Sequence, residues 1–498
     1  MNPTRPADGS WHLVVIGGGL AGLAAALEGA DRGARVTLLE RRNRLGGLTW
    51  SFRHGDHWVD NGQHVFLRCC EEYLGFLDRI GAASEVELPD RLDIPVVAPG
   101  AGAGAPRFGR LRRSDLPAPL HLAGSLLRFP HLPLTARLGL GRAVLDLRRL
   151  DLADPALDRE SFGDWLGRHG QAPATVTALW DLITIPTVNL RAADASLAMA
   201  AKVFQTGLLT DTRAADIGWS RVPLGHLHGV RAGAALEKAG VQVHLGAAVQ
   251  AVQAVERDAD RAPSFTVRTA AASLDADAVI MAVPHDVAGP LLPPDSVANQ
   301  TRLGELGTSA IVDVHLVFDR PVTRWPLLAG LHSPIQWVFD RTASSGLSTE
   351  LAGHHGEPGH QGQQYVAVSV SAADELLGRR PDQVSAWIAT ELARLLPEAA
   401  GARVLDAIVT KERHATFRAA PGTAPLRPAA STAWPGLAVA GAWTDTGWPA
   451  TMEGAVRSGR AAAGVVCAAA GPPRAVPVAA GSATARSTHP IPRTEEVA

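Results

Sequence analysis

The sequence predicts an α/β protein in which both ends of the chain build one parallel sheet and an α+β domain is inserted between them. Three observations predict this fold class. Residues 12–40 follow the order strand, glycine turn, helix and strand. Residues 436–466 return with a strand, a loop and a helix of small residues. Between them, residues 91–214 contain few strand signals and place leucine and arginine at helical spacing.

The length and composition allow two domains. The chain has 498 residues, 46% of them hydrophobic, which is more than one compact core usually needs. The tail is rich in proline, alanine, serine and threonine and is expected to be disordered. The expected division is a discontinuous nucleotide-binding domain of residues 1–90, 215–285 and 411–470, a substrate domain with a helical cap and a sheet of residues 91–214 and 286–410, and a tail of residues 471–498.

Alternating and helical patterns of apolar residues predict the remaining elements. Strands are expected at residues 241–245, 247–255, 265–269, 278–283, 309–319, 364–371 and 437–441. Helices are expected at residues 383–396 and 452–468. No internal repeat is evident, so the chain is not a solenoid or an array.

The charge and the cysteines restrict the class of protein. With 47 basic and 49 acidic residues the formal net charge is -2, so no nucleic-acid partner is expected. The three cysteines, Cys69, Cys70 and Cys467, do not suit a disulfide framework and are expected to be buried thiols in a reducing compartment. No secretory pattern and no run of about 18 uncharged apolar residues is present. These features predict a cytoplasmic protein, in contact at most with the inner face of the membrane.

A glycine motif joins the first strand to the first helix. Gly17, Gly19 and Gly22 form a G-x-G-x-x-G pattern, with Leu20 and Ala21 at the start of the helix. Gly17 allows a tight turn, Gly19 lets backbone amides reach a diphosphate, and Gly22 lets the helix pack closely on the sheet. The helix N-terminus adds a partial positive charge beside the phosphates. The motif predicts a Rossmann-like dinucleotide site made of these five residues.

An acidic residue and a second glycine pair favour FAD as the dinucleotide. Glu40 ends the second strand 18 residues after Gly22 and can accept hydrogen bonds from a ribose, with Arg41 beside it. A carboxylate there disfavours the 2′-phosphate of NADP. Gly46 and Gly47 follow at once and let the backbone approach a long, extended cofactor.

The segment near the C-terminus supplies further expected contacts with the flavin. Gly441 follows the last strand, and a helix begins near Thr451, Met452 and Glu453. The helix dipole could stabilise negative charge on a reduced flavin ring. Val249, on an expected strand of the same domain, completes the predicted cofactor-binding set.

These motifs resemble the flavin amine oxidase and phytoene desaturase superfamily. A narrower resemblance, over roughly residues 12–467, is to the squalene-associated FAD-dependent enzymes, the hydroxysqualene dehydroxylases of bacterial hopanoid synthesis. It is carried by Val59–Leu67, Gly218–Leu224, Pro334–Asp340 and Pro449–Gly459. One residue departs from the pattern, because Ala442 stands where related sequences usually have an acid that binds the ribityl chain, and Asp445 lies three residues on.

The resemblance implies that hydroxysqualene, a lipophilic triterpene alcohol, is reduced to squalene with hydride from reduced FAD. Loss of the hydroxyl as water needs a proton donor. Asp60 and His64, with Asn61 between them, are the expected catalytic groups, and their alternative role is to cap a turn and fill a structural site. An aromatic pocket would stabilise the developing charge. Its expected walls, for which ordinary core packing is the alternative, are Trp219, Trp337, Trp443 and Trp448.

Three other functions compete with this interpretation. Carotenoid desaturation would use the same scaffold to oxidise a polyene. Amine oxidation often uses a lysine and an aromatic cage beside the flavin, but no lysine lies between Lys238 and Lys411 and the chain has 2 tyrosines. A flavin-binding module without catalysis is the third alternative.

The remaining expectations concern membranes, metals and assembly. The segment 107–149 mixes nine arginines with many leucines, which favours either a face that contacts a membrane or a cap whose arginines face water. No metal site is expected, since His354, His355 and His360 are interrupted by glycine and proline and lack a paired carboxylate. The sequence leaves the oligomeric state open.

Overall fold

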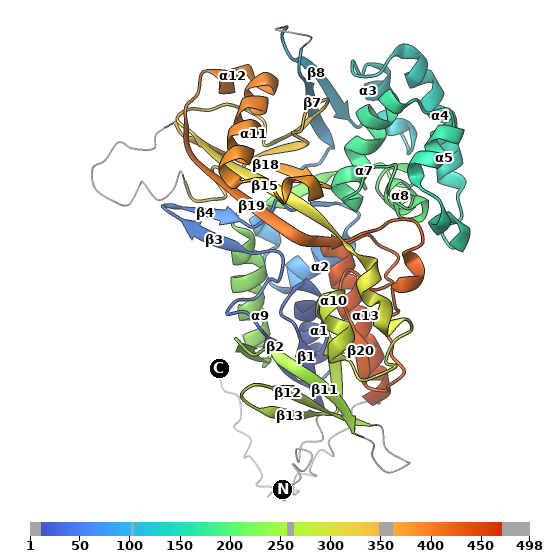
Figure 1. The fold of residues 1–498 in the computed structure, drawn as a ribbon, viewed down its shortest axis with the longest axis vertical. Helices are drawn as coiled ribbons and strands as arrows, with labels where there is room; N and C mark the ends of the chain where they lie inside the picture. Colours follow the sequence, from blue (N-terminus) through green and yellow to red (C-terminus); the bar gives the residue numbers. More distant parts are fainter. Residues whose placement is uncertain (1–10, 101–103, 256–262, 348–361, 471–498) are drawn as a thin grey trace, which may run out of the picture.

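A five-stranded parallel sheet forms the base of the molecule in the computed structural model, which describes residues 11–100, 104–255, 263–347 and 362–470. Its strand order is β10 (Gln242–Leu245), β2 (Arg35–Glu40), β1 (His12–Ile16), β14 (Ala278–Met281) and β20 (Leu437–Val439). Every neighbouring pair is parallel. Figure 1 shows the first and last strands in this one layer, which confirms that both chain ends build the sheet.

Helices and a small meander cover the two faces of this sheet. On one face lie α1 (Leu20–Asp31) and α13 (Met452–Ala470), which pack so closely that a Cβ on Gly459 would lie 2.1 Å from the Ala21 carbonyl oxygen. The same core takes in α2 (Glu71–Arg79) and α9 (Ala232–Lys238). The other face packs against the antiparallel strands β11 (Val249–Val255), β12 (Ser264–Thr269) and β13 (Ser273–Ala276).

A seven-stranded mixed sheet forms the second body of the molecule. Its order is β19 (Val404–Phe417), β15 (Thr308–Phe318), β18 (Gln364–Ser371), β17 (Trp337–Asp340), β16 (Leu327–Gly330), β7 (Asp93–Ala98) and β8 (Arg107–Arg112). The helices α11 (Pro381–Leu395) and α12 (Pro397–Ala400) cover one face, where Val312, Val314 and Leu316 are buried. Because side chains alternate along a strand, Asp313 and His315 of β15 lie on the opposite face.

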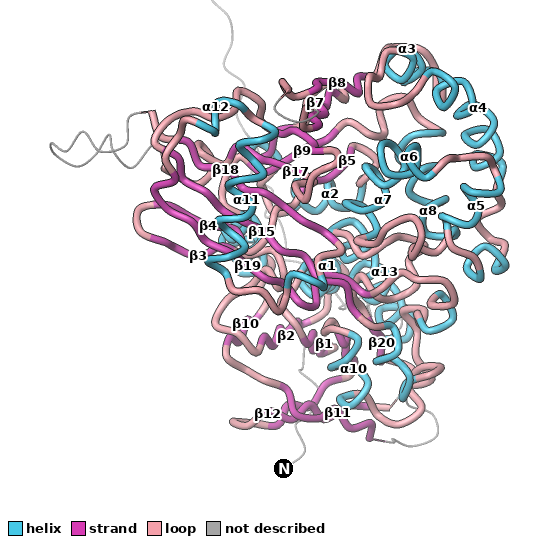
Figure 2. The backbone as a smooth tube through the Cα atoms, turned by 45° about the horizontal axis from the view of Figure 1, so that its top comes forward, coloured by secondary structure: helices cyan, strands magenta, loops and turns pink. Residues whose placement is uncertain are grey.

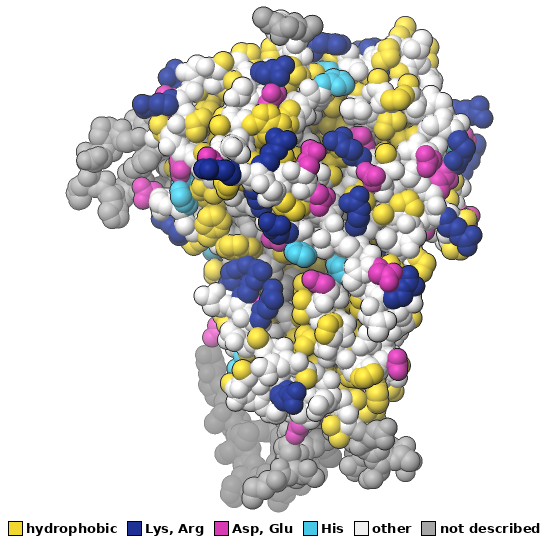
Figure 3. Space-filling model, viewed as in Figure 1, with side chains coloured by type: hydrophobic (Ala, Val, Ile, Leu, Met, Phe, Trp, Pro, Cys, Tyr) yellow, Lys and Arg dark blue, Asp and Glu magenta, His cyan; other side chains and the backbone are white. Residues whose placement is uncertain are grey.

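A helical cap packs against the β7 end of the mixed sheet (Figure 2). It contains α3 (Ala123–Leu127), α4 (Leu134–Arg149), α5 (Phe162–Arg168), α6 (Pro173–Thr175), α7 (Asp181–Val188) and α8 (Leu197–Phe204). Its core is aromatic, with Phe162, Trp180 and Phe204 in mutual contact. Figure 3 shows hydrophobic side chains and arginines side by side over the part of this face where Figure 1 labels α3 and α4.

Two small sheets connect the bodies. One pairs β3 (Ser51–His54) with β4 (His57–Asp60). The other places β9 (Ile217–Ser220) between β5 (Val65–Leu67) and β6 (Val86–Glu87). The chain therefore passes between the bodies several times, and the turns at these crossings bring distant residues together.

Two predicted domain boundaries need correction. The boundary between residues 410 and 411 cuts β19, which pairs with β15 along its whole length and belongs to the mixed sheet. The predicted substrate domain includes the segment after residue 285, but α10 (His285–Leu291) and the turn Gln300–Leu306 bury Ala288, Leu303 and Leu306 in the core of the parallel sheet. The predicted tail, residues 471–498, lies outside the described residues.

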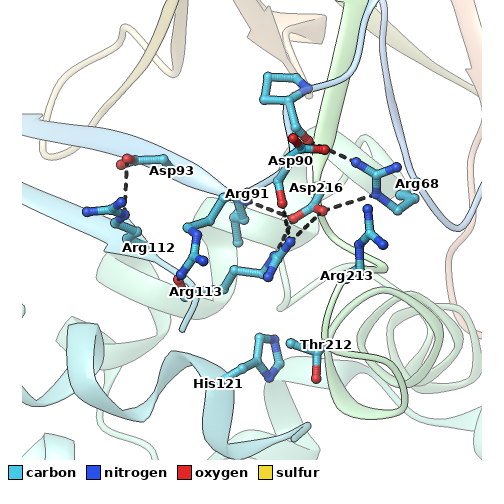
Figure 4. Close-up of polar contacts among 12 residues, drawn as sticks. Arg68, Asp90, Arg91, Asp93, Arg112, Arg113, His121, Thr212, Arg213 and Asp216 are labelled. Carbon is cyan, nitrogen blue, oxygen red and sulfur yellow. Dashed lines mark hydrogen bonds and ion pairs between the residues drawn. The ribbon is translucent and has the colours of Figure 1, made fainter. Parts of the chain in front are cut away.

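The buried carboxylate of Asp216 holds together chain segments at the junction between the cap and the base (Figure 4). Asp216 is fully buried and accepts hydrogen bonds from Arg113 Nε at 2.6 Å and Arg68 Nε at 3.1 Å. Its Oδ1 also accepts from the Leu92 amide at 2.7 Å. Burial opposes ionisation, but the hydrogen bonds from Arg113 and Arg68 outweigh it and hold the pKa of Asp216 below its usual value. The carboxylate thus joins the residues that directly follow β5 and β8 to those that directly precede β7 and β9.

We expect Asp216→Asn to lower the free energy of unfolding by about 2–3 kcal/mol at neutral pH, because two guanidinium groups lose their charged acceptor. An asparagine still accepts from the Leu92 amide. A carboxyl group with a depressed pKa stabilises the fold above its unfolded pKa, so the difference between the proteins should shrink as the pH falls below about 4. Denaturant unfolding at several pH values measures this. Asp115→Asn, at a neighbouring carboxylate that is 77% exposed, is the matched control and should leave the midpoint unchanged.

Candidate active site

The glycine turn after β1 has a backbone path that only glycine fits. Gly17 has a φ of +108°, and a Cβ there would lie 2.3 Å from the Ala282 carbonyl oxygen. A Cβ on Gly22 would lie 1.8 Å from the Gly17 oxygen, so α1 packs directly on the turn. Gly19 is the N-cap of α1 and has no side-chain capping bond, which leaves the first amides of the helix, at Leu20 and Ala21, without a capping side chain.

The second glycine pair lies against this turn. The Gly46 amide donates to the Gly18 oxygen at 2.9 Å, and a Cβ on Gly47 would lie 2.8 Å from the Gly19 Cα. Both glycines have positive φ values, +97° and +59°. The two turns therefore form a wall of bare backbone at the carboxyl edge of β1 and β2, as a diphosphate-binding site requires.

Glu40 supports the wall from below. Its Oε2 accepts from the Gly18 amide at 2.6 Å and its Oε1 from the Arg42 amide at 2.8 Å. Each carboxylate oxygen keeps a second lone pair, so both remain able to accept from a ribose hydroxyl. Arg41 is exposed at the same edge, and Val249 lies just beyond it, where the Ala247 amide donates to the Glu40 oxygen at 2.8 Å.

The C-terminal segment reaches the same edge of the sheet. Gly441 has a φ of +142°, and its amide donates to Ser458 Oγ at 2.8 Å, which ties the end of β20 to α13. Thr451 caps α13 by accepting from the Gly454 amide at 3.1 Å, and Met452 is buried in the core beneath α1. The helix thus begins at Met452, as predicted, and its second turn is tied to the residue region that follows β20.

The side chain of Glu453 has its partners within the protein. Its carboxylate accepts from the Tyr73 amide at 2.8 Å, from the Glu72 amide at 3.3 Å and from Arg457 Nε at 2.5 Å. These donors belong to the N-terminus of α2 and to the next turn of α13. The side chain therefore fastens two helices together, so the predicted contribution of this position to the cofactor site is that of the helix N-terminus and not of the carboxylate.

Asp60 is committed to a buried ion pair. Its Oδ2 accepts from Arg341 Nη2 at 2.8 Å, and its Oδ1 accepts from Ser51 Oγ at 2.6 Å and the Leu224 amide at 3.0 Å. Both members of the pair are less than 10% exposed. Both oxygens of this carboxylate are thus occupied by donors from the protein itself, one of them charged. Its predicted role as a proton donor is therefore replaced by a structural one.

His64 lies two residues beyond the glycine of the Asp60 turn. Its Nδ1 lies 3.1 Å from the Gly62 carbonyl oxygen, and because that oxygen can only accept, Nδ1 carries the proton. Burial lowers the pKa of His64, which favours the neutral ring. Nε2 is then an acceptor, so His64 is better suited to orient a hydroxyl group than to protonate it.

The sequence-based prediction missed Asp313, which faces the same turn from β15. It is 1% exposed, and its Oδ1 accepts from the Gln63 amide at 3.3 Å. Its Oδ2 has no hydrogen-bond partner among the described residues. Burial raises the pKa of Asp313 to about 7, against the smaller opposing effect of the Ser369 hydroxyl. The only sequence signal was an aspartate within an otherwise apolar, alternating strand.

The same face of the mixed sheet carries a second buried polar group. His315 Nδ1 lies 2.7 Å from the Tyr365 hydroxyl and Nε2 lies 3.2 Å from Thr410 Oγ1. Burial lowers the pKa of His315 to about 3, so the ring is neutral at physiological pH. This network holds β15, β18 and β19 in register beside Asp313.

The four tryptophans have separate environments. Trp443 is 5% exposed, packs in the core of the parallel sheet and donates to the Val283 oxygen at 2.9 Å, so its role is ordinary core packing. Trp448 lies between Lys202 and Arg457, with the cations 5.2 and 5.0 Å from its ring centroid. Trp219 packs at the edge of the cap core. Trp337 lines a cavity between α7 and the mixed sheet, together with Ile185 and Gln336.

The fold and the site define a flavoprotein, and the chain belongs to the flavin containing amine oxidoreductase family, whose profile matches residues 20–467. Among curated relatives, hydroxysqualene dehydroxylase of Rhodopseudomonas palustris is 27% identical, with coverage of 91% of this chain and 98% of the relative. The 15-cis-phytoene desaturase of Solanum lycopersicum is 23% identical, with coverage of 92% and 77%. The resemblance drawn from the sequence is thus confirmed.

Solved structures confirm the fold class. A putrescine oxidase variant superposes with a TM-score of 0.68 at 19% identity and covers 92% of this chain and 99% of its own. Cyclohexylamine oxidase from Brevibacterium oxydans gives a TM-score of 0.65 at 17% identity, with the same coverage. A flavin family and a backbone cradle shaped for a dinucleotide together identify the cofactor as FAD, as predicted.

Three further expectations concern Asp445, membrane-spanning helices and the histidine-rich stretch. Asp445, considered as a substitute for the acid missing at Ala442, is exposed, and its carboxylate accepts from the Gly447 amide at 3.3 Å within its own turn. No helix among the described residues combines the length and the apolar character needed to cross a bilayer. The histidines at 354, 355 and 360 lie outside the described residues.

Proposed function

We propose that this oxidoreductase reduces hydroxysqualene to squalene. The observation that carries the proposal is the match to hydroxysqualene dehydroxylase over 91% of this chain and 98% of the relative, whereas the phytoene desaturase matches over 77% of its length. FAD, when bound in its reduced form, supplies a hydride for such a reduction. The chain's own residues must bind a long apolar alcohol, exclude water and donate one proton.

Amine oxidation finds little support in the site. Lys411 donates to the backbone oxygens of Leu376 and Leu377 at 3.2 and 3.1 Å, and Lys202 lies over Trp448. Lys238 is the last residue of α9, whose buried residues belong to the core of the parallel sheet. No lysine therefore faces that turn, where the neutral histidines and Asp313 gather.

Product analysis tests the proposal. The purified holoenzyme is reduced with dithionite without oxygen and mixed with hydroxysqualene, and the extract is analysed for squalene by mass spectrometry. Parallel reactions offer phytoene or putrescine to the oxidised enzyme. Squalene formation supports dehydroxylation, whereas a desaturated carotenoid or an aldehyde from the amine would replace it with the corresponding activity.

We also propose that the cap contacts an anionic membrane surface, from which a triterpene alcohol would enter. The supporting observation is a second apolar stripe on α4. Leu140, Ala143 and Leu147 are buried on one side, while Leu134, Leu138 and Leu145 on the other are 63%, 71% and 45% exposed. Their spacings of four and seven residues place the exposed leucines on one face of the helix.

Charge and neighbouring leucines extend this surface. Arg142 and Arg149 flank the stripe with side chains 86% and 76% exposed. Leu116, Leu120 and Leu127, before α4, are each more than half exposed. Exposed leucines bordered by arginines suit insertion into the interface of an anionic bilayer.

We expect the double substitution Leu134→Ser and Leu138→Ser to weaken binding to vesicles of anionic phospholipid by about tenfold or more, since two exposed leucine side chains no longer enter the bilayer. Co-sedimentation measures the bound fraction. Val230→Ser is the matched control, because Val230 is 60% exposed on the base of the molecule, near α9. Equal binding of both variants and the wild type would remove α4 from the proposed surface.

A further inference from the structure

We propose that Asp313 is the group that protonates the leaving hydroxyl, in place of Asp60 and His64. This inference rests on the proposed dehydroxylation and names the catalytic acid that the reaction requires. It concerns a residue on the mixed sheet, 250 positions along the chain from the turn that it faces.

The geometry places an open carboxyl oxygen at the turn between Asp60 and His64. A Cβ built on Gly62 would lie 3.3 Å from Asp313 Oδ2 and 3.6 Å from His64 Cε1. Both groups therefore border the space that the glycine leaves free. Oδ1 is anchored by the Gln63 amide, while Oδ2 makes no hydrogen bond of normal geometry in the described part of the chain, with the Ser369 hydroxyl as the neighbouring donor that acts on the carboxyl group. A buried polar atom without a partner is costly in a folded protein, and a substrate hydroxyl would satisfy it.

The surrounding charges allow Asp313 to hold a proton at neutral pH. The Asp60 carboxylate lies close enough to disfavour a second negative charge, and its own charge is balanced by Arg341. Four other titratable groups border the site from the same turn and the same sheet face, namely His64, His315, Tyr365 and His57. The three histidines have lowered pKa values from burial, and the pKa of Tyr365 is raised, so all four are neutral there.

A pKa of about 7 suits a general acid that works at neutral pH. Asp60 is less suited to this role because Arg341 donates a hydrogen bond to it directly. His64 is less suited because its Nδ1–H donates to the Gly62 carbonyl oxygen. Among these three groups, Asp313 alone combines a proton with an unoccupied oxygen.

The proposed step is balanced. The proton passes from the Asp313 carboxyl to the substrate hydroxyl, the allylic carbon–oxygen bond breaks with its electron pair, and water leaves. Reduced FAD, when bound, would supply the hydride that the carbon accepts and would be oxidised by two electrons. Asp313 remains as a carboxylate and regains its proton from solvent before the next turnover.

Asp313→Asn tests the inference, because the amide has the shape of the protonated carboxyl group but cannot donate an acidic proton. In the holoenzyme we expect retained flavin absorbance, retained hydroxysqualene binding and a loss of about 100-fold or more in the single-turnover rate of squalene formation. Asp313→Ser, which also lacks the acid, should show the same loss if the asparagine variant folds poorly. Asp313→Glu should recover part of the rate.

A second readout does not depend on turnover. A carboxyl group whose folded pKa is raised stabilises the fold fully below its unfolded pKa, and this contribution is lost as the pH rises through the folded value. The melting temperature of the wild type should therefore fall relative to Asp313→Asn between about pH 4 and pH 7 and then level off. Asp60→Asn should not reproduce this relative pH profile.

The outcomes separate the inference from the proposed function. A wild-type enzyme that forms no squalene overturns the function and this step with it. A wild type that forms squalene, together with an Asp313→Asn enzyme within about tenfold of its rate, overturns the role of Asp313 alone. Parallel melting profiles of the two proteins would also contradict it.

Discussion

A Gly19→Glu protein is expected to fold and to purify colourless. A carboxylate at this position enters the wall of bare backbone where the diphosphate lies, and like charges in one site repel. The substitution itself is sterically mild, because the nearest described atom to a Cβ there is the Gly47 Cα, at 3.7 Å. We expect the affinity for FAD to fall by about 1,000-fold or more, since one repulsive charge against two phosphates costs several kcal/mol. Flavin absorbance per protein measures the loss.

The matched control is Gly75→Glu. Gly75 is an exposed glycine in α2, and no described atom lies within 4 Å of its added Cβ. This variant adds the same charge and should keep full flavin occupancy. Normal FAD content in Gly19→Glu would show that the glycine turn is not the diphosphate site.

The second large effect is expected at the ion pair of Asp60 and Arg341. Asp60→Asn leaves the Arg341 guanidinium buried without a counter-charge, and breaking a buried pair in this way costs about 3–5 kcal/mol. The same reasoning applies to Arg341→Met, which leaves the Asp60 carboxylate buried without a counter-charge. Natural proteins are stable by only about 5–15 kcal/mol, so either change should be evident in a denaturant titration.

The double variant Asp60→Asn with Arg341→Met completes the cycle. We expect it to be more stable than the sum of the single losses predicts, by about 1–3 kcal/mol, because neither charge is left alone. The exposed pair of Arg302 and Glu305 is the control, and Glu305→Gln should leave the unfolding midpoint unchanged. Strict additivity would mean that Asp60 and Arg341 do not interact in the folded protein.

Features that depend on the backbone conformation of neighbouring residues were predictable from the sequence. The glycine turn, the strand that ends at Glu40 and the Gly46–Gly47 pair depend on conformations that neighbouring residues determine, and all three lie where expected. The strands β15 and β18 and the helix α11 were also predicted within two residues at either end, because their apolar periods are regular.

The strands β7 and β8 pair with each other and were missed because only a distant strand, β16, joins them to the mixed sheet. β8 is an edge strand with arginine at three of its six positions, a pattern typical of an exposed segment. β7 pairs with β16, where Val96 lies opposite Ala329. No local signal in residues 91–214 announces that pairing, so the first part of the Arg-rich segment was expected to be part of a helical cap.

The separate roles of Asp60 and Asp313 could not be predicted from the sequence for the same reason. Arg341 reaches Asp60 across 281 residues, and Asp313 reaches Gln63 across 250. The motif around Asp60 marked the correct region of the chain. It did not reveal which carboxyl group is paired and which keeps a proton, because partners from two other elements decide this.

The reduced holoenzyme offers the most direct test of the account. Anaerobic mixing with hydroxysqualene should restore the absorbance of oxidised flavin, with one squalene formed for each flavin oxidised. A reduced flavin that stays reduced under these conditions, in an enzyme whose oxidised form is bleached by phytoene or an amine, would contradict the account.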